Sequence, residues 1–174
     1  MNPLILGMDI SSTAIGYVVR NGAVIDRGVI RLDGKAHIGA RCVVARDALA
    51  ALLDRIVVDA IAIESPVARF ASAIIPQCRV GGVVLELAER RGIVTCEIAP
   101  AEAKRALASN GDASKAQMLA AAAAHFGYDG DALAYVARRG EWIAITSGMG
   151  VYSEHEADAL GVAMAAARKV EVLA

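Results

Sequence analysis

Residues 4–19 read LILGMDISSTAIGYVV, two apolar runs joined by a short stretch of serine and threonine. This pattern predicts a strand, a tight turn and a returning strand. Asp9 stands near the end of the first run. Aspartate is disfavoured inside strands and costly to bury without a partner, so this position favours a ligand role, most simply the binding of a cation. The same side chain could instead cap the turn through Ser12 or Thr13.

Strands and helices alternate along the rest of the chain, as in an α/β domain. A turn at Gly22 and the apolar stretch 23–32 complete an antiparallel meander of three strands. Near-continuous apolar runs, the pattern of buried parallel strands, occupy 56–64 and 93–99. Helical spacing of apolar residues predicts helices over 37–55, 71–91, 100–108, 114–126 and 154–170. We therefore expect an α/β fold with a mixed five-stranded sheet, three antiparallel strands and then two parallel ones, flanked by helices.

The composition indicates a single domain that covers residues 1–174. Of the 174 residues, 56% are hydrophobic, enough to bury one sizeable core. No apolar run approaches membrane-spanning length, and no basic region precedes the first one, so we expect a cytoplasmic protein without a membrane partner. The scattered Cys42, Cys78 and Cys96 fit reduced thiols in that compartment. The net charge of -1 means that any nucleic-acid surface must be local.

The stretch from Tyr128 to Ser153 does not follow the alternation seen elsewhere. It holds several glycines around the apolar run 142–146, which makes its elements hard to assign. We interpret 128–153 as an insertion in the domain and expect a short helix over 132–138.

Four residues in three segments form a candidate metal-binding constellation. Asp9 and Glu64 each end an apolar strand, so their carboxylates lie side by side at the carboxyl edge of the sheet if those strands are neighbours. His155 and Asp158 are three residues apart, so one helix face presents both. Carboxylate oxygens are the ligands that Mg²⁺ and Mn²⁺ prefer, and two such ions can activate a water for attack on a phosphodiester.

Four segments, in this order, resemble the RuvC family of Holliday-junction resolvases, which are ribonuclease-H-like nucleases. They are residues 7–17 (GMDISSTAIGY), 62–64 (AIE), 103–104 with 110–117 (AK and NGDASKAQ) and 155–161 (HEADALG). Each motif is weak by itself, but four in the order of the family are specific. The resemblance covers nearly the whole chain and implies a ribonuclease-H-like α/β fold.

The resemblance also implies the roles of the site residues. Asp9, Glu64 and Asp158 correspond to the acidic metal ligands of the family, and His155 takes a position that holds an aspartate or a histidine. His155 would ligate a metal or help to deprotonate the attacking water. The implied cofactor is Mg²⁺, with two ions per site and with Mn²⁺ able to substitute.

Five residues are implied as DNA-binding candidates. Lys104 and Lys115 correspond to family lysines that face phosphates near the scissile bond, where Lys115 would also stabilise charge that develops on the phosphate. Family members place an aromatic residue in the loop after the glutamate, and Phe70 is the nearest aromatic here. Arg69 and Arg79 flank the same loop and could line a DNA groove.

The function implied by the resemblance is that of a crossover junction endodeoxyribonuclease. Such an enzyme acts in DNA recombination and repair as a homodimer, whose two sites make paired symmetric nicks across a four-way DNA junction. The chain would act in the cytoplasm of a bacterial cell, encoded by the bacterium or by a phage.

The residues leave other interpretations open. Residues 7–13 also look like the first phosphate loop of sugar kinases and actin-like ATPases, although those proteins need a second domain for which 174 residues leave no room. A nuclease of the same fold could process other branched DNA or RNA, and a junction-binding protein could lack cleavage. Lys104 and Lys115 could be ordinary surface charges. Glu154 and Glu156 are interpreted as first-turn residues of the last helix, with Glu156 turned off its ligand face.

Overall fold

The main sheet of the computed structural model, which describes residues 2–67, 71–147 and 149–173, has five strands in the order β3-β2-β1-β4-β5. Strands β1, β2 and β3 pair antiparallel, and β4 and β5 continue the sheet in parallel with β1. The expected mixed sheet is therefore confirmed. Its strands are β1 (Ile5–Ile10), β2 (Ala14–Arg20), β3 (Val24–Arg31), β4 (Ala60–Glu64) and β5 (Val94–Ile98).

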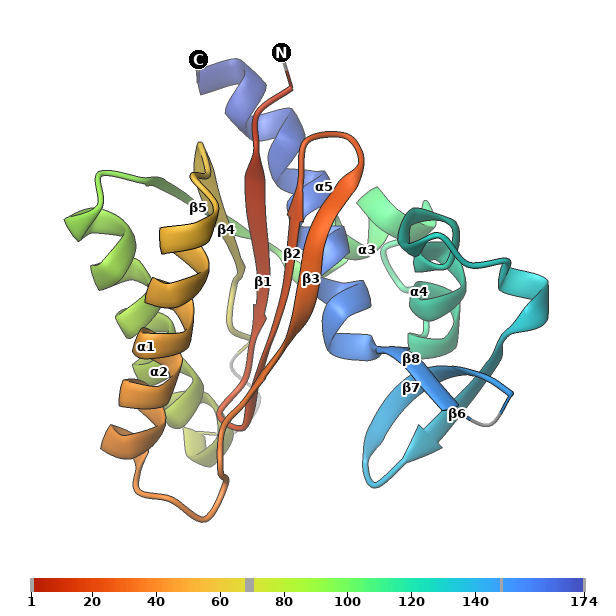
Figure 1. Cartoon of the computed structure of the whole chain (residues 1–174), viewed down its shortest axis with the longest axis horizontal. Coiled ribbons are helices and arrows are strands. Elements are labelled where there is room, and N and C mark those ends of the chain that lie inside the picture. The colour runs from red at the N-terminus through yellow and green to blue at the C-terminus, as the bar shows by residue number, and fades with distance from the viewer. Residues whose placement is uncertain (1, 68–70, 148, 174) are drawn as a thin grey trace.

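Helices cover both faces of this sheet (Figure 1). Helices α1 (Ile38–Arg55) and α2 (Ala71–Arg90) lie on one face, and α5 (Glu154–Leu173) crosses the other. Helices α3 (Pro100–Ala108) and α4 (Lys115–Ala122) pack against α5. No helix in the described part of the chain is both long and apolar enough to cross a membrane.

The alternation of side chains along β1 separates the two faces. Leu6, Met8 and Ile10 are buried in the core that α1 and α2 cover. Gly7 lies between them on the opposite face, where a Cβ atom would meet the backbone of α5 at Ala159 and Ala163. The first strand therefore presents its small residue, and two positions later Asp9, to α5.

Capping residues set the ends of the helices near the site. Pro100 opens α3, where a missing N–H costs nothing. Ser114 and Gln117 form a capping box at the start of α4, each accepting a hydrogen bond from the backbone N–H of the other. Helix α4 ends at Ala122, earlier than predicted, and a short 3₁₀ turn follows over Ala124–Phe126.

The prediction of a helix over 132–138 is wrong. Those residues form the end of a 3₁₀ turn and then a strand, the first of a second, three-stranded antiparallel sheet. Glu141 to Thr146 form the central strand, and a two-residue turn connects it to the strand before. The strands are β6 (Ala134–Arg138), β7 (Glu141–Thr146) and β8 (Met149–Ser153), and β8 leads directly into α5. Figure 1 shows this small sheet beside the main one, at the end of the molecule where α5 begins.

Candidate active site

Two carboxylates meet at the carboxyl edge of the main sheet. Strands β1 and β4 are parallel, and Met8 pairs with Ile63, so Asp9 and Glu64 are the next residues in register. Both lie on the sheet face that α5 covers, because their neighbours Met8 and Ile63 point into the opposite core. The edge predicted from the sequence is therefore formed.

Helix α5 brings the other two predicted ligands to this edge. Gly16 of β2 faces the helix, and a Cβ atom there would lie 2.1 Å from the carbonyl oxygen of His155. This close approach places His155 Nδ1 2.7 Å from Asp9 Oδ2. Asp158 follows one turn later on the same helix face and is buried. Strand β2 thus needs a glycine at this position for α5 to deliver its imidazole.

Lys115 completes the cluster from the first turn of α4. Its Nζ lies 2.5 Å from Asp158 Oδ2 and 3.1 Å from Glu154 Oε2. Both carboxylates are almost fully buried, whereas the lysine side chain is 44% exposed. The ammonium group is therefore held between two carboxylates at the end of a partly exposed side chain.

The electrostatics of the site are those of crowded negative charge. Burial, followed by the charges of Asp9 and Asp158, raises the pKa of Glu64 from 4.5 to about 8. Burial also raises the pKa of Asp158, although Lys115 opposes this. Burial is the largest single effect on His155 and lowers the pKa of the imidazole, but the hydrogen bond to Asp9 and the charges of Asp9, Glu141 and Glu154 together outweigh it, so that the pKa is raised. The site thus holds protons that a cation would displace.

The donor set fits a hard divalent cation in its chemistry. Carboxylates of Asp9, Glu64 and Asp158 and one imidazole converge on the sheet edge, and their mutual repulsion is what a bound cation relieves. In the described part of the chain no three such side chains stand arranged as a metal-holding group. Here Asp9 is engaged with His155 and Asp158 with Lys115. Metal binding would therefore compete with these two contacts.

The remaining DNA-binding candidates have different surroundings. The charge of Lys104, on α3, lowers the pKa of Glu64, so this lysine lies within electrostatic reach of the cluster. Arg79 is exposed on α2, and its backbone carbonyl accepts a hydrogen bond from Cys42 on α1. Among the described residues, no side-chain contact joins Arg79 to the cluster. Arg69 and Phe70 lie outside the described residues.

Three glutamates near the site were missed or given no role by the sequence. Glu154 is the second partner of Lys115. Glu141, at the start of β7, accepts a hydrogen bond from Arg31 at 2.8 Å, and its charge contributes to the raised pKa of His155. Glu156 is turned off the ligand face, as predicted, but it is buried against Arg27. The partners are between 39 and 129 residues away in the chain, so no local pattern could identify them.

Comparison with known proteins identifies the family. The model of the family described as crossover junction endodeoxyribonuclease RuvC matches residues 5–124. The chain belongs to the RuvC family. The matched part of the RuvC pattern includes Asp9, Glu64, Lys104 and Lys115, whereas His155 and Asp158 lie beyond it. Members of the family are metal-dependent nucleases.

Curated RuvC proteins from several bacteria are similar to the chain. The RuvC of Frankia casuarinae is 30% identical over 121 residues, which are 66% of this chain and 70% of that protein. The RuvC of Leifsonia xyli subsp. xyli is 32% identical over 67% of this chain. The match spans only 59% of the Leifsonia protein and 61% of the RuvC of Frankia alni. The sequence likeness therefore covers part of the relatives' length.

Solved structures of RuvC and of another Holliday junction resolvase share the fold. The structure of Thermus thermophilus RuvC in complex with a Holliday junction substrate aligns with a TM-score of 0.76, at 19% identity, over 98% of this chain and 96% of that one. The yeast mitochondrial Holliday junction resolvase Ydc2 aligns with a TM-score of 0.58, at 13% identity, over 96% of this chain and 80% of that one. The fold is thus the ribonuclease-H-like fold of RuvC, as expected.

Proposed function

We propose that this chain is a metal-dependent endonuclease that resolves four-way DNA junctions by paired symmetric nicks. The observation that carries the proposal is the convergence of Asp9, Glu64, His155 and Asp158 at one sheet edge, with Lys115 beside them. It is supported by the family to which the chain belongs, whose curated members are named for crossover junction cleavage. The same relatives are bacterial, and we place the activity in the bacterial cytoplasm.

The proposed cofactor is Mg²⁺, with two ions per site and with Mn²⁺ as a substitute. When bound, such ions polarise the phosphate and lower the pKa of a nucleophilic water. Asp9, Glu64 and Asp158 would hold them through carboxylate oxygens, the donor type that suits both ions, and His155 would either add a nitrogen or help to deprotonate the water. The support is the donor set and the raised pKa of Glu64, which reflects its burial and the neighbouring charges of Asp9 and Asp158.

The protein residues have complementary tasks in the proposed reaction. In the neutral imidazole, the Nδ1–H of His155 donates a hydrogen bond to Asp9, which leaves Nε2 free either to ligate a metal or to accept a proton from water. Asp9 thereby orients the ring. The ammonium group of Lys115 stabilises the charge that develops on the phosphate. Glu154 keeps that group near the site when Asp158 turns to another partner.

The DNA would approach the open side of this edge. We propose that Lys104 and Lys115 face the phosphates around the scissile bond, and that Arg69, Phe70 and Arg79 line the path of the strands beside it. The support for Lys104 is its electrostatic reach to Glu64. For Arg69 and Phe70 it is their place in the sequence shortly after β4, and for Arg79 it is its exposure on α2, the next helix.

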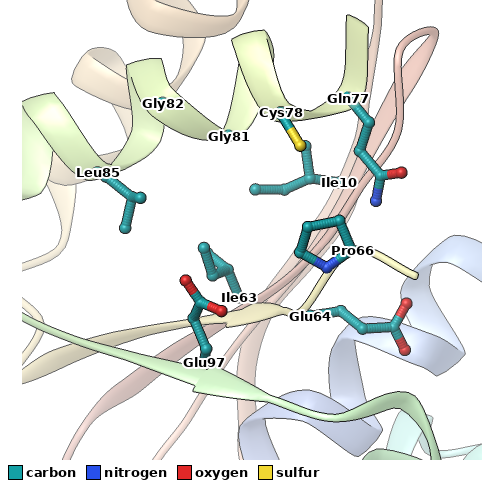
Figure 2. Close-up of a pocket in the computed structure, with 10 residues that line it drawn as sticks. All are labelled: Ile10, Ile63, Glu64, Pro66, Gln77, Cys78, Gly81, Gly82, Leu85 and Glu97. Carbon is teal, nitrogen blue, oxygen red and sulfur yellow. The ribbon is translucent and has the colours of Figure 1, made fainter. Parts of the chain in front are cut away.

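The proposed assembly is a homodimer, with residues 1–174 as one nuclease domain into which 128–153 is inserted. A pocket of 170 Å³ lies between α2 and the ends of β4 and β5, and Figure 2 shows Glu64 at its rim with the carboxylate directed away from Leu85. Beside this pocket, Gly81 and Gly82 leave open space around α2. A second copy of α2 could approach closely there and give the two sites that paired nicks require.

The test is cleavage of an end-labelled synthetic four-way junction, with and without Mg²⁺ or Mn²⁺. Linear duplex, flap and RNA–DNA hybrid substrates serve as controls. We expect paired symmetric nicks in the junction only, and only with metal. Equal cutting of flaps or hybrids would leave a nuclease without junction selectivity, and binding without cutting in any metal would mean that the chain is a junction-binding protein.

A further inference from the structure

The second sheet, β6 to β8, lies beside the active site but beyond the part of the chain that the family model matches. That match ends at residue 124, and the sheet spans 134–153. Strand β8 runs into α5 without a loop, so the sheet is attached to the first turn that bears His155. An element in this position is placed to contact the same substrate as the active site.

The sheet is held firmly against the rest of the protein. Ala144 and Tyr152 are buried in a core that also contains Leu119 of α4. The Tyr152 hydroxyl donates a hydrogen bond of 2.7 Å to the carbonyl oxygen of Leu119. Arg27 of β3 donates to the carbonyl oxygen of Val151. The orientation of the sheet relative to the active site is therefore set by packing and hydrogen bonds.

The turn between β6 and β7 presents two arginines to solvent. Arg138 and Arg139 are both exposed, and no ion pair or hydrogen bond of their side chains is found within the described ranges. Arg139 and Gly140 have φ values of 52° and 84°, as the two central residues of a type I′ turn do. A long side chain is uncommon in this left-handed conformation, and strain of this kind gathers at functional sites.

One residue connects this turn to the catalytic cluster. Glu141 directly follows the turn and pairs with Arg138 across the two strands. Its carboxylate accepts a hydrogen bond from Arg31 at the end of β3. Burial acts to raise the pKa of Glu141, but the hydrogen bond and charge of Arg31, followed by the charge of His155, outweigh burial and lower this pKa. His155 therefore lies within electrostatic reach of Glu141. The two exposed arginines thus directly precede Gly140 and Glu141, and the charge of Glu141 acts on the imidazole of His155.

We propose that Arg138 and Arg139 bind the phosphate backbone of a duplex DNA arm beside the strand that is cut. Guanidinium groups bind phosphates with two parallel hydrogen bonds, and cationic side chains release the counterions of DNA when they do so. The acidic cluster next to the turn repels the same backbone, so flanking positive charge is needed to hold it. This inference rests on the proposed function, whose substrate it places on the second sheet.

The test measures junction affinity as a function of salt, in metal-free buffer so that no strand is cut. The variant carries Arg138→Ala and Arg139→Ala. The matched control carries Arg90→Ala and Arg168→Ala, which remove two exposed arginines from the ends of α2 and α5 that lie far from the site. A charge-preserving variant, Arg138→Lys with Arg139→Lys, shows whether cationic charge is what matters.

Each lost phosphate contact lowers the slope of log affinity against log salt by about 0.9. We expect the slope of the alanine variant to fall by about 1 to 2, for junctions of any sequence, and the control and lysine variants to keep the wild-type slope. An unchanged slope in an alanine variant that still melts like the wild type would overturn the inference. In that case wild-type junction cleavage would remain, whereas failure of the proposed function removes junction cleavage itself.

Discussion

At the scale of single residues, Glu64 gives the most direct evidence that the site binds a cation. It stands at the end of a parallel strand, half-buried, with the carboxylates of Asp9 and Asp158 near it. A carboxyl group with a pKa of about 8 keeps its proton at neutral pH. Loss of that proton is therefore linked to the arrival of positive charge, which is how a metal ligand at a crowded site behaves.

This linkage predicts how the stability of the metal-free protein depends on pH. Between about pH 4.5 and about pH 8 the folded state keeps the Glu64 proton that the unfolded chain releases, so the free energy of unfolding falls as the pH rises. We expect the Tm of the metal-free protein to drop across this range, and Glu64→Gln to flatten the drop. Thermal melts at several pH values check this. A Glu89→Gln variant, which changes an exposed carboxylate of α2, is the control. An equal drop in Glu64→Gln would contradict the prediction.

The sequence predicts the ligands of this site better than it predicts their partners. Asp9 and Glu64 are conspicuous because a carboxylate at the end of an apolar strand needs a reason to be there. Glu154 gave no such signal, since a glutamate in the first turn of a helix is common. Its ion pair with Lys115 depends on the packing of α4 against α5, and no local pattern in the sequence encodes that distance.

At the scale of elements, the contact of α5 with the sheet depends on small residues. Gly7 of β1 and Gly16 of β2 let the helix backbone lie directly on the strands, and Ala159 and Ala163 fill the helix side of the contact. A larger residue in place of Gly16 would lift the start of α5 away from Asp9. The catalytic geometry is therefore a consequence of how closely one helix can approach one sheet.

We predict that Gly16→Ala separates His155 from Asp9. The added Cβ would lie 2.1 Å from a backbone oxygen that no side-chain rotation can move. Overpacking of this kind costs about 2 to 3 kcal/mol, and junction cleavage should fall much further than stability does. Gly150→Ala is the control, because its Cβ meets only the end of Ile143 at 3.8 Å. Melting temperature and cleavage rate, measured on both variants, check this, and wild-type cleavage by Gly16→Ala would rule it out.

A buried ion pair fixes the start of α5 from the other side. The Arg27 guanidinium pairs with Glu156 and lies 4.6 Å from the centroid of the Phe126 ring. The other carboxylate oxygen of Glu156 accepts a hydrogen bond of 2.9 Å from the backbone N–H of Ser153. These contacts join β3, the 3₁₀ turn after α4, and the first turn of α5. Loss of the Glu156 charge would leave the partly buried guanidinium with neutral acceptors, the Val151 carbonyl oxygen and the Tyr128 hydroxyl.

We predict that Glu156→Gln lowers the free energy of unfolding by about 3 kcal/mol, the usual loss when one partner of a buried pair is removed. The matched control is Glu86→Gln, which breaks the exposed pair of Glu86 with Arg90 on α2 and should cost no more than about 0.5 kcal/mol. Urea denaturation of the two variants gives both values. Equal losses would mean that burial of the Arg27 pair does not matter to stability.

The elements that the sequence predicts wrongly are those whose structure depends on the second sheet. Residues 132–138 contain enough alanine for a helix, but Tyr135 and Val136 favour a strand. Pairing with β7 and burial of Ala144 decide between the two. The strands of the main sheet are predicted well, because their apolar runs are long enough to need burial wherever they lie.

At the scale of the whole molecule, α2 presents an apolar stripe that a monomer has no reason to expose. Along the side of α2 that borders the pocket lie, at helical spacing, Ile75, Cys78, Gly82 and Leu85, with Ile75 48% exposed and Leu85 36% exposed. The pocket beside them continues this surface toward Glu64. A second copy that covers the stripe would couple two active sites.

We predict that Leu85→Glu converts a dimer into a monomer, because it places two charges in a surface that self-association would bury. Light scattering coupled to size exclusion gives the mass. Val57→Glu, at the 89% exposed residue after α1, is the control and should stay dimeric. If the Leu85→Glu variant is still a dimer, or if the wild type is a monomer, the prediction that this stripe forms the dimer interface is wrong.

The measurement that tests the account most directly compares the wild type with Asp9→Asn on one labelled four-way junction in Mg²⁺. Asparagine keeps the shape of the side chain but removes the charge that holds His155 and that a cation needs. We predict junction binding by both proteins, paired nicks by the wild type, and a cleavage rate at least about 1,000-fold lower for the variant. Cleavage by Asp9→Asn at the wild-type rate would remove this cluster from the reaction.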